Sequence, residues 1–136
     1  MAIDIVTTQS EDQLYGHIFV GAVRDVDHIK LDTSTLTTAE VDANGYLKPG
    51  VGFLQSGVIV TTTAQTIYGV TFEAIKLPGR TSNTTPALSG DTTDPLIAVA
   101  TGGLINRDLA EDYLGRAYTA NELTALTAGG FKVTST

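Results

Sequence analysis

The two histidines of the chain, His17 and His28, are the first residues to consider as metal ligands. They lie in neighbouring segments with strand-like patterns, residues 15–23 and 28–32, and would face each other across a hairpin. A zinc site takes three or four ligands, usually with thiolate or carboxylate support. The sequence has no cysteine and no His-x-His or His-Glu-x-x-His spacing to complete such a site. We therefore interpret both histidines as exposed or structurally bonded side chains, and expect no metal and no cofactor.

Carboxylates come together in two places, Asp25 with Asp27 and Asp91 with Asp94. Calcium loops use such clusters, but neither pair has the oxygen spacing of an EF-hand loop or the glycine that bends one. Solvated turns explain both pairs.

No nucleophile or phosphate-binding loop is apparent in the sequence. The serines fall in terminal and loop segments, and none lies in a Gly-x-Ser-x-Gly elbow. Residues 79–83 lack the Gly-Lys-Thr/Ser ending of a phosphate loop. The sequence thus predicts a protein that is not an enzyme.

Composition narrows the class of partner. The 136 residues suffice for one domain with a modest core, and the absence of cysteine excludes disulfides. A formal charge of −7 repels phosphate backbones and anionic membranes, so we expect no nucleic acid and no membrane partner. The N-terminus lacks basic residues and a continuous apolar run, from which we expect no signal peptide. A protein is the expected partner.

The elements that position these residues are mostly strands, because threonine makes up roughly one residue in six and favours strands, while glycine punctuates turns. Residues 24–27 are expected to turn, and residues 33–41 to be irregular. Asn44-Gly45 and Lys48-Pro49-Gly50 are turn signals. The segments expected to form strands after these turns are 51–54, 57–61 and 66–77, the last being the longest. Residues 78–93 are predicted to form a long exposed loop.

The segment from Asp94 to Phe131 packs several elements into a short stretch. Residues 96–100 are predicted to be a buried strand, and a glycine turn and an Asn-Arg-Asp corner follow it. Thr119 and Glu122 have the spacing of a capping box, which predicts a helix with Leu123 and Leu126 on one face and an end at Gly129-Gly130. A strand over residues 131–133 closes the chain.

A further helix is possible over residues 107–114. There Glu111 and Asp112 could pair with Arg107 or Arg116, each pair contributing on the order of a few tenths of a kcal/mol.

The first residues of the chain are interpreted as an arm, residues 1–13, and residues 14–136 as a single β-rich domain. The start of the chain alternates like a strand, whereas residues 7–13 are polar and have no partner strand nearby. An ordinary first strand within the sheet is the alternative that this pattern leaves open. The alternating residues are Ala2, Ile3, Asp4, Ile5 and Val6.

The order of elements from Asp94 to Phe131, following Tyr68-Gly69-Val70 and the Leu47-Lys48-Pro49-Gly50 turn, resembles the head decoration (cement) proteins of tailed phages, the lambda decoration protein family. The resemblance covers roughly residues 45–133 and is a pattern of elements and turns. It implies a mainly β fold with one or two short helices, a compact β-clip or β-tulip-like decoration protein fold.

The resemblance further implies a capsid decoration protein made in the host cytoplasm and carried on the outer surface of the virion capsid. It would bind the major capsid protein as a homotrimer at three-fold sites of the mature head, and stabilise the head against internal DNA pressure. The arm residues 2–6 would make the capsid contact. The portion before Asn44 and the loop over residues 78–93 are longer than compact members of the family need, which leaves the oligomer contacts open.

A receptor- or glycan-binding β module of a virion fibre or adhesin is the alternative function, with the threonine-rich loop over residues 78–93 as its recognition surface. The sequence lacks the clustered aromatic residues that stack on sugars.

Overall fold

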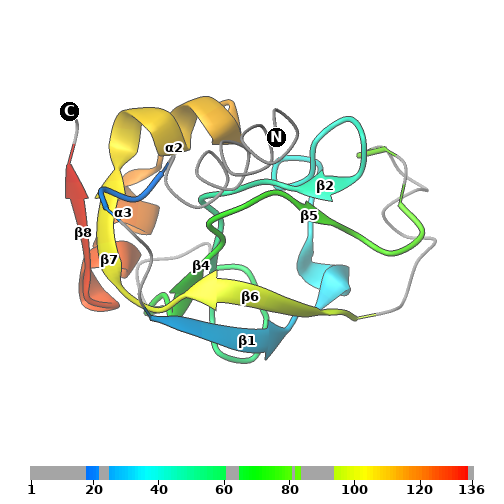
Figure 1. The fold of residues 1–136 in the computed structure, drawn as a ribbon, viewed down its shortest axis with the longest axis horizontal. Coiled ribbons are helices and arrows are strands. Elements are labelled where there is room, and N and C mark those ends of the chain that lie inside the picture. Colours follow the sequence, from blue (N-terminus) through cyan, green and yellow to red (C-terminus); the bar gives the residue numbers. More distant parts are fainter. Residues whose placement is uncertain (1–17, 22–24, 61–64, 81, 84–93, 135–136) are drawn as a thin grey trace, which may run out of the picture.

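The computed structural model of the chain describes residues 18–21, 25–60, 65–80, 82–83 and 94–134 (Figure 1). In these ranges the chain forms a small, mainly β domain with two short α-helices, as the composition predicts. The strands are β1 (Val26–Lys30), β2 (Tyr46–Leu47), β3 (Gly52–Phe53), β4 (Gly69–Val70), β5 (Ile75–Lys76), β6 (Leu96–Ala100), β7 (Gly103–Asn106) and β8 (Phe131–Thr134). The helices are the 3-10 turn η1 (Thr33–Thr35), α2 (Arg107–Leu114) and α3 (Ala120–Ala128).

The largest sheet has the strand order β1-β6-β4-β3 and is antiparallel throughout. β6 is the strand predicted over residues 96–100, and it pairs with β1 along five residues, from Val26 opposite Ala100 to Lys30 opposite Leu96. The inward-facing side chains Ile29, Ile97 and Val99 are buried. The outward-facing positions of β1 and the start of β6 are exposed, so this pair covers the core with one face only.

The two α-helices connect the strands of a separate parallel pair. β7 runs directly into α2, and α3 leads into β8, which lies parallel to β7 with Gly103 opposite Phe131. Figure 1 shows this unit at one end of the molecule and the β2-β5 pair toward the other end. A crossover of two helices is the kind of connection that parallel strands need.

A single hydrophobic core links these parts. Its buried side chains come from every sheet and from both α-helices, and include Leu47, Phe53, Val70, Ile105, Leu114 and Leu126. The helix signals read from the sequence are confirmed. Thr119 and Glu122 form a reciprocal capping box at the start of α3. The helix proposed over residues 107–114 is found as α2, with a cap at Asn106 that was not predicted.

The predicted burial of α3 needs one adjustment. Leu126 is 1% exposed and belongs to the core, whereas Leu123 is only partly buried and packs against the core's edge. Both leucines lie on the face expected, but Leu126 supplies the deeper contact.

The predicted hairpin between residues 15–23 and 28–32 is wrong where the structure describes it. Phe19 forms a bridge with Ile105 of β7, and the amide of Val20 donates to the carbonyl oxygen of Leu104 at 2.8 Å. Phe19 and Val20 therefore pair with β7 and not with β1, which pairs with β6. The turn expected over residues 24–27 is also displaced, because Val26 and Asp27 belong to β1. Residues 15–17 and 22–24 lie outside the described ranges.

The long strand predicted over residues 66–77 is divided between two sheets. Its first part forms β4 in the four-stranded sheet, and its last part forms β5, which pairs with β2. The change of sheet follows Thr71, whose amide donates to the carbonyl oxygen of Val51 at 3.0 Å and whose hydroxyl donates to that of Lys48 at 2.8 Å. These bonds hold Thr71 beside the turn at Gly50, and the chain then crosses to β2.

The loop predicted to be exposed over residues 78–93 is wrong at its start. A turn at residues 78–79 leads the chain inward, and Arg80 is only 1% exposed. The amide of Arg80 donates to the carbonyl oxygen of Leu77 at 3.2 Å, and its own carbonyl oxygen accepts a hydrogen bond from Lys76. Residues 81 and 84–93 lie outside the described ranges.

Candidate functional site

The residues that the sequence singles out for capsid contact are not described by the structure. Ala2, Ile3, Asp4, Ile5 and Val6 all precede residue 18, and His17 and Asp91 are likewise outside the described ranges. Among the residues that are described, no group of three or more His, Cys, Asp or Glu side chains could hold a metal ion. His28 is exposed on β1.

The interpretation of Asp27 as a turn residue is wrong, because Asp27 belongs to β1. The carboxylates of Asp27 and Asp94 are half-exposed, and each also holds another segment of the chain. Asp94 accepts hydrogen bonds from the hydroxyl of Thr33 at 2.7 Å and from its amide at 3.0 Å, and these bonds lower the pKa of Asp94. Asp27 accepts a short hydrogen bond from the hydroxyl of Tyr68, which lowers the pKa of Asp27 and raises that of Tyr68. Each carboxylate joins segments more than 40 residues apart.

The outer edge of β1 is a place where another strand could add, and the structure partly closes it. Leu31 donates to the carbonyl oxygen of Pro95, so in an antiparallel pair the odd-numbered residues bond to β6 and the backbone groups of Val26, His28 and Lys30 face away. The His28 amide donates instead to the carboxylate of Asp27 at 2.8 Å. This local bond uses a donor that an added strand would need.

The far end of the same edge is closed by the turn at Gly57. The carbonyl oxygen of Gly57 accepts a hydrogen bond from the amide of Asp32 at 3.1 Å. Gly57 has a φ of +88°, and a Cβ atom there would lie 1.9 Å from the carbonyl oxygen of Lys30. The β1 edge is thus guarded at His28 and at Lys30, as is common for exposed edge strands.

The outward face of the β1-β6 pair carries apolar side chains beside polar ones. Leu96 is 72% exposed and Val26 is 45% exposed, at opposite ends of the pair. On the same face, His28 lies between these two ends and Lys30 lies directly opposite Leu96.

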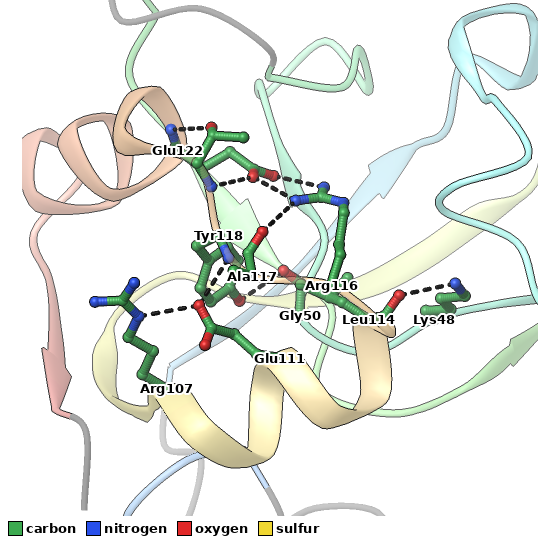
Figure 2. A network of polar contacts seen from close by, with 10 residues as sticks. Lys48, Gly50, Arg107, Glu111, Leu114, Arg116, Ala117, Tyr118 and Glu122 are labelled. Atoms are coloured by element: carbon green, nitrogen blue, oxygen red, sulfur yellow. Dashed lines mark hydrogen bonds and ion pairs between the residues drawn. The ribbon is translucent and has the colours of Figure 1, made fainter.

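A polar network joins α2 to the start of α3 (Figure 2). Arg107 pairs with Glu111 one helical turn later at 3.0 Å, as the sequence predicts, and Glu111 also accepts the amide of Tyr118 at 2.7 Å. Burial by itself would raise the pKa of Glu111, but the hydrogen bonds from Arg107 and Tyr118 outweigh it and lower that pKa. Glu111 therefore fixes the connection that leaves α2.

The second ion pair of the network is between Arg116 and Glu122, not between Arg116 and the acidic residues of α2. The guanidinium donates to both carboxylate oxygens of Glu122, at 2.7 and 2.9 Å, and also to the carbonyl oxygen of Ala117 at 3.0 Å. Figure 2 shows this bidentate contact beside the capping box. Burial opposes ionisation of Glu122, yet the contact with Arg116 and the Thr119 amide lower its pKa.

The same helical unit is bonded to the turn before β3. The Tyr118 hydroxyl donates to the carbonyl oxygen of Gly50 at 2.8 Å, and Lys48 donates to that of Leu114, at the end of α2, at 2.9 Å. Gly50 has a φ of +90°, as the second central position of a type II turn requires. The predicted turn over Lys48-Pro49-Gly50 is thus bonded to the end of α2 and to the segment that connects α2 with α3.

A hollow of about 130 Å³ opens where these elements meet. It is lined by Glu40, Val51, Gly52, Ile59, Val60, Arg116, Thr119 and Glu122. Glu40 is 7% exposed, and one of its carboxylate oxygens, Oε1, accepts both the amide of Thr37 at 2.7 Å and its hydroxyl at 2.8 Å. The hollow combines apolar walls from β3 and residues 59–60 with charged groups on its other side.

Reasoning from the sequence did not find this hollow. Thr119 and Glu122 were expected to cap a helix, but nothing in the local pattern indicates that Glu40 lies beside them, because 82 positions separate Glu40 from Glu122. A Thr-x-x-Glu spacing at Thr37 and Glu40 was the available signal, since it predicts a buried, locally bonded carboxylate.

Comparison with known proteins does not identify a family: no family model, no curated protein and no solved structure matches this chain. None of the helices in the described part of the chain is long and apolar enough to cross a membrane.

Proposed function

We propose that this chain is a decoration (cement) protein of tailed-phage heads. In this proposal it has a β-clip or β-tulip-like decoration fold, binds the outside of the mature head as a homotrimer at three-fold sites, and stabilises the head against the pressure of packaged DNA. It is a structural protein of the virion surface and not an enzyme.

One observation carries the proposal: the succession of elements from β6 to β8. A strand, a glycine turn, a second strand that ends in an Asn cap, two short helices and a closing strand follow one another over residues 96–134. β4, at Gly69–Val70, pairs with β6, and the Lys48-Pro49-Gly50 turn is hydrogen-bonded to Leu114 and Tyr118. The resemblance to the decoration proteins rests on the first strand, the glycine turn, the Asn-Arg-Asp corner, the capped helix and the closing strand of this succession, together with Tyr68-Gly69-Val70 and the turn at Gly50.

The charge of the chain supports a protein partner. A formal charge of −7 opposes contact with packaged DNA or with an anionic membrane, whereas the major capsid protein is available on the outer surface of a head. The arm residues Ala2 to Val6 make the contact in this proposal.

The guarded edge of β1 bears on the direction of strand addition. Asp27 uses the His28 amide, and the turn at Gly57 blocks the edge at Lys30, so β1 is poorly suited to receive a strand. In this proposal the arm, with Ile3 and Ile5 at alternate positions, donates a strand to an edge of the capsid protein. Burying one such isoleucine contributes roughly 1.5 to 3 kcal/mol before ordering costs, and three arms on a trimer act together through effective concentration.

The proposal is tested by mixing the purified chain with two kinds of head assembled without it: expanded, DNA-filled heads and their unexpanded precursors. The chain should sediment with the expanded heads and should not sediment with the precursors. Its binding should saturate at three copies for each three-fold site. A lack of attachment to either head contradicts the proposal. Attachment to cells or glycans, with none to heads, favours the receptor-binding alternative instead.

A further inference from the structure

The hollow beside Arg116 has a ligand chemistry of its own. We propose that it binds a single lysine side chain of a protein partner, with the aliphatic stem on the apolar wall and the ammonium group at Glu40. The inference concerns this hollow alone and holds whether or not the partner is a phage head.

The charges of the hollow favour a cation. Two carboxylates, those of Glu40 and Glu122, face one guanidinium, that of Arg116, which leaves one negative charge in excess. Arg116 is already engaged by both oxygens of Glu122, and the nearby carboxylates raise the pKa of Arg116, Glu122 first. An anion would find no free positive charge there.

Glu40 offers the acceptor for such a cation. Its Oε1 is used by Thr37, while no hydrogen bond from the described residues reaches its other oxygen, Oε2. The residue is 7% exposed and lines the hollow. A carboxylate that is more than nine-tenths buried gains most from an ammonium donor when one of its oxygens is open.

The geometry distinguishes lysine from arginine. Both oxygens of Glu122 are occupied by Arg116, so Glu40 Oε2 is a single acceptor. A guanidinium makes its strong contact with two acceptors at once, whereas an ammonium group is a point charge that one oxygen can hold. The hollow therefore fits lysine better.

The apolar wall completes the fit. Val51, Ile59 and Val60 line the hollow and are themselves almost fully buried. The four methylene groups of lysine can lie against such a wall while the charged end reaches a polar group. A volume of about 130 Å³ accommodates one side chain of this kind.

The test is an NMR titration of the full chain with Nα-acetyl-lysine methylamide, following the amides of Val51, Gly52 and Val60. The norleucine analogue, which lacks the ammonium group, and the arginine analogue serve as comparison probes. The lysine probe should give saturable shifts, the arginine probe weaker binding, and the norleucine probe no saturable binding. Linear shifts with lysine, equal shifts with norleucine, or tighter binding of arginine overturn the proposal.

A pair of variants adds a second test. Glu40→Gln keeps an oxygen for Thr37 but removes the charge, and should weaken binding of the lysine probe about tenfold. Glu73→Gln, which removes the same charge away from the hollow, should bind as the unmodified chain does. Equal affinity in both variants overturns the proposal. If Glu40→Gln does not fold, the comparison of the three probes on the unmodified chain still decides.

Discussion

The hydroxyl of Tyr118 donates a hydrogen bond of 2.8 Å to the carbonyl oxygen of Gly50, 68 residues earlier in the chain. Tyr118 is 5% exposed, and burial raises its pKa, so the hydroxyl stays protonated as a donor at all ordinary pH values. The bond joins the helical unit to the turn before β3. Together with the Lys48–Leu114 bond and the shared core, it holds this unit against the sheet.

Replacing Tyr118 with Phe should therefore destabilise the domain by about 1 to 3 kcal/mol, because the carbonyl oxygen of Gly50 is left buried without this donor. Denaturant unfolding measures the change. Tyr46→Phe is the matched control, since Tyr46 is 38% exposed and its ring contact with Lys76 does not need the hydroxyl. Equal midpoints for the two variants would show that the buried bond has no net effect.

Substitutions at the cap of α3 and on its buried face should differ in their cost to stability. Thr119→Ala should cost about 1 kcal/mol through loss of the helix cap, and Leu126→Ala about 2 to 5 kcal/mol through a cavity in the core. Leu123→Ala should cost less stability than Leu126→Ala, because Leu123 is only partly buried. Thr124→Ala, at an exposed position of the same helix, is the control. A cap variant less stable than the Leu126 variant contradicts this account of α3.

Gly57 should resist substitution. Alanine at φ +88° costs about 1 to 2 kcal/mol in backbone strain, and its Cβ would also collide with the carbonyl oxygen of Lys30. Gly57→Ala is expected to lower the unfolding midpoint and to open the guarded edge of β1, seen as faster amide exchange at Asp32. Gly102→Ala provides the control, because no atom lies within 4 Å of its Cβ position. Equal unfolding midpoints for Gly57→Ala and Gly102→Ala would contradict the prediction that the position of Gly57 requires glycine.

Acid should destabilise the domain through Glu122. Its pKa is lowered from 4.5 in the folded chain, so the folded state binds protons less readily than the unfolded state. The stabilisation is complete above the unfolded pKa and is lost as the pH falls through the folded pKa. Glu122→Gln should make the loss of stability below about pH 4.5 shallower, and Asp112→Asn, which removes a charge at an exposed position of α2, is the comparison variant. Unfolding measured across this pH range decides, and an unchanged slope in Glu122→Gln contradicts the assignment.

The features predicted correctly from the sequence are those encoded within a few residues. The capping box of Thr119 and Glu122 and the turn at Gly50 each depend on neighbouring positions, and both are found. β6 was recognised because a continuous apolar run follows Pro95.

The features missed depend on partners far along the chain. The division between β4 and β5 follows from the bonds of Thr71 to Lys48 and Val51, at least 20 residues away. Burial of Arg80 and the meeting of Glu40 with Arg116 have the same origin, since tertiary packing decides them and local propensity does not. Sequence reasoning found the candidate site only at its helix-capping side, at Thr119 and Glu122.

The central claim, that the chain stabilises phage heads by donating its arm to the capsid protein, is tested most directly by heating filled heads decorated with the Ile3→Asp, Ile5→Asp double variant. The two aspartates should lower the temperature at which the heads release DNA, while the melting of the isolated protein stays nearly unchanged, because the substitutions lie in the arm. Deletion of residues 1–12 should act in the same way and more strongly. Heads that carry the double variant at full occupancy and release DNA at the same temperature as heads with the unmodified chain would contradict the claim.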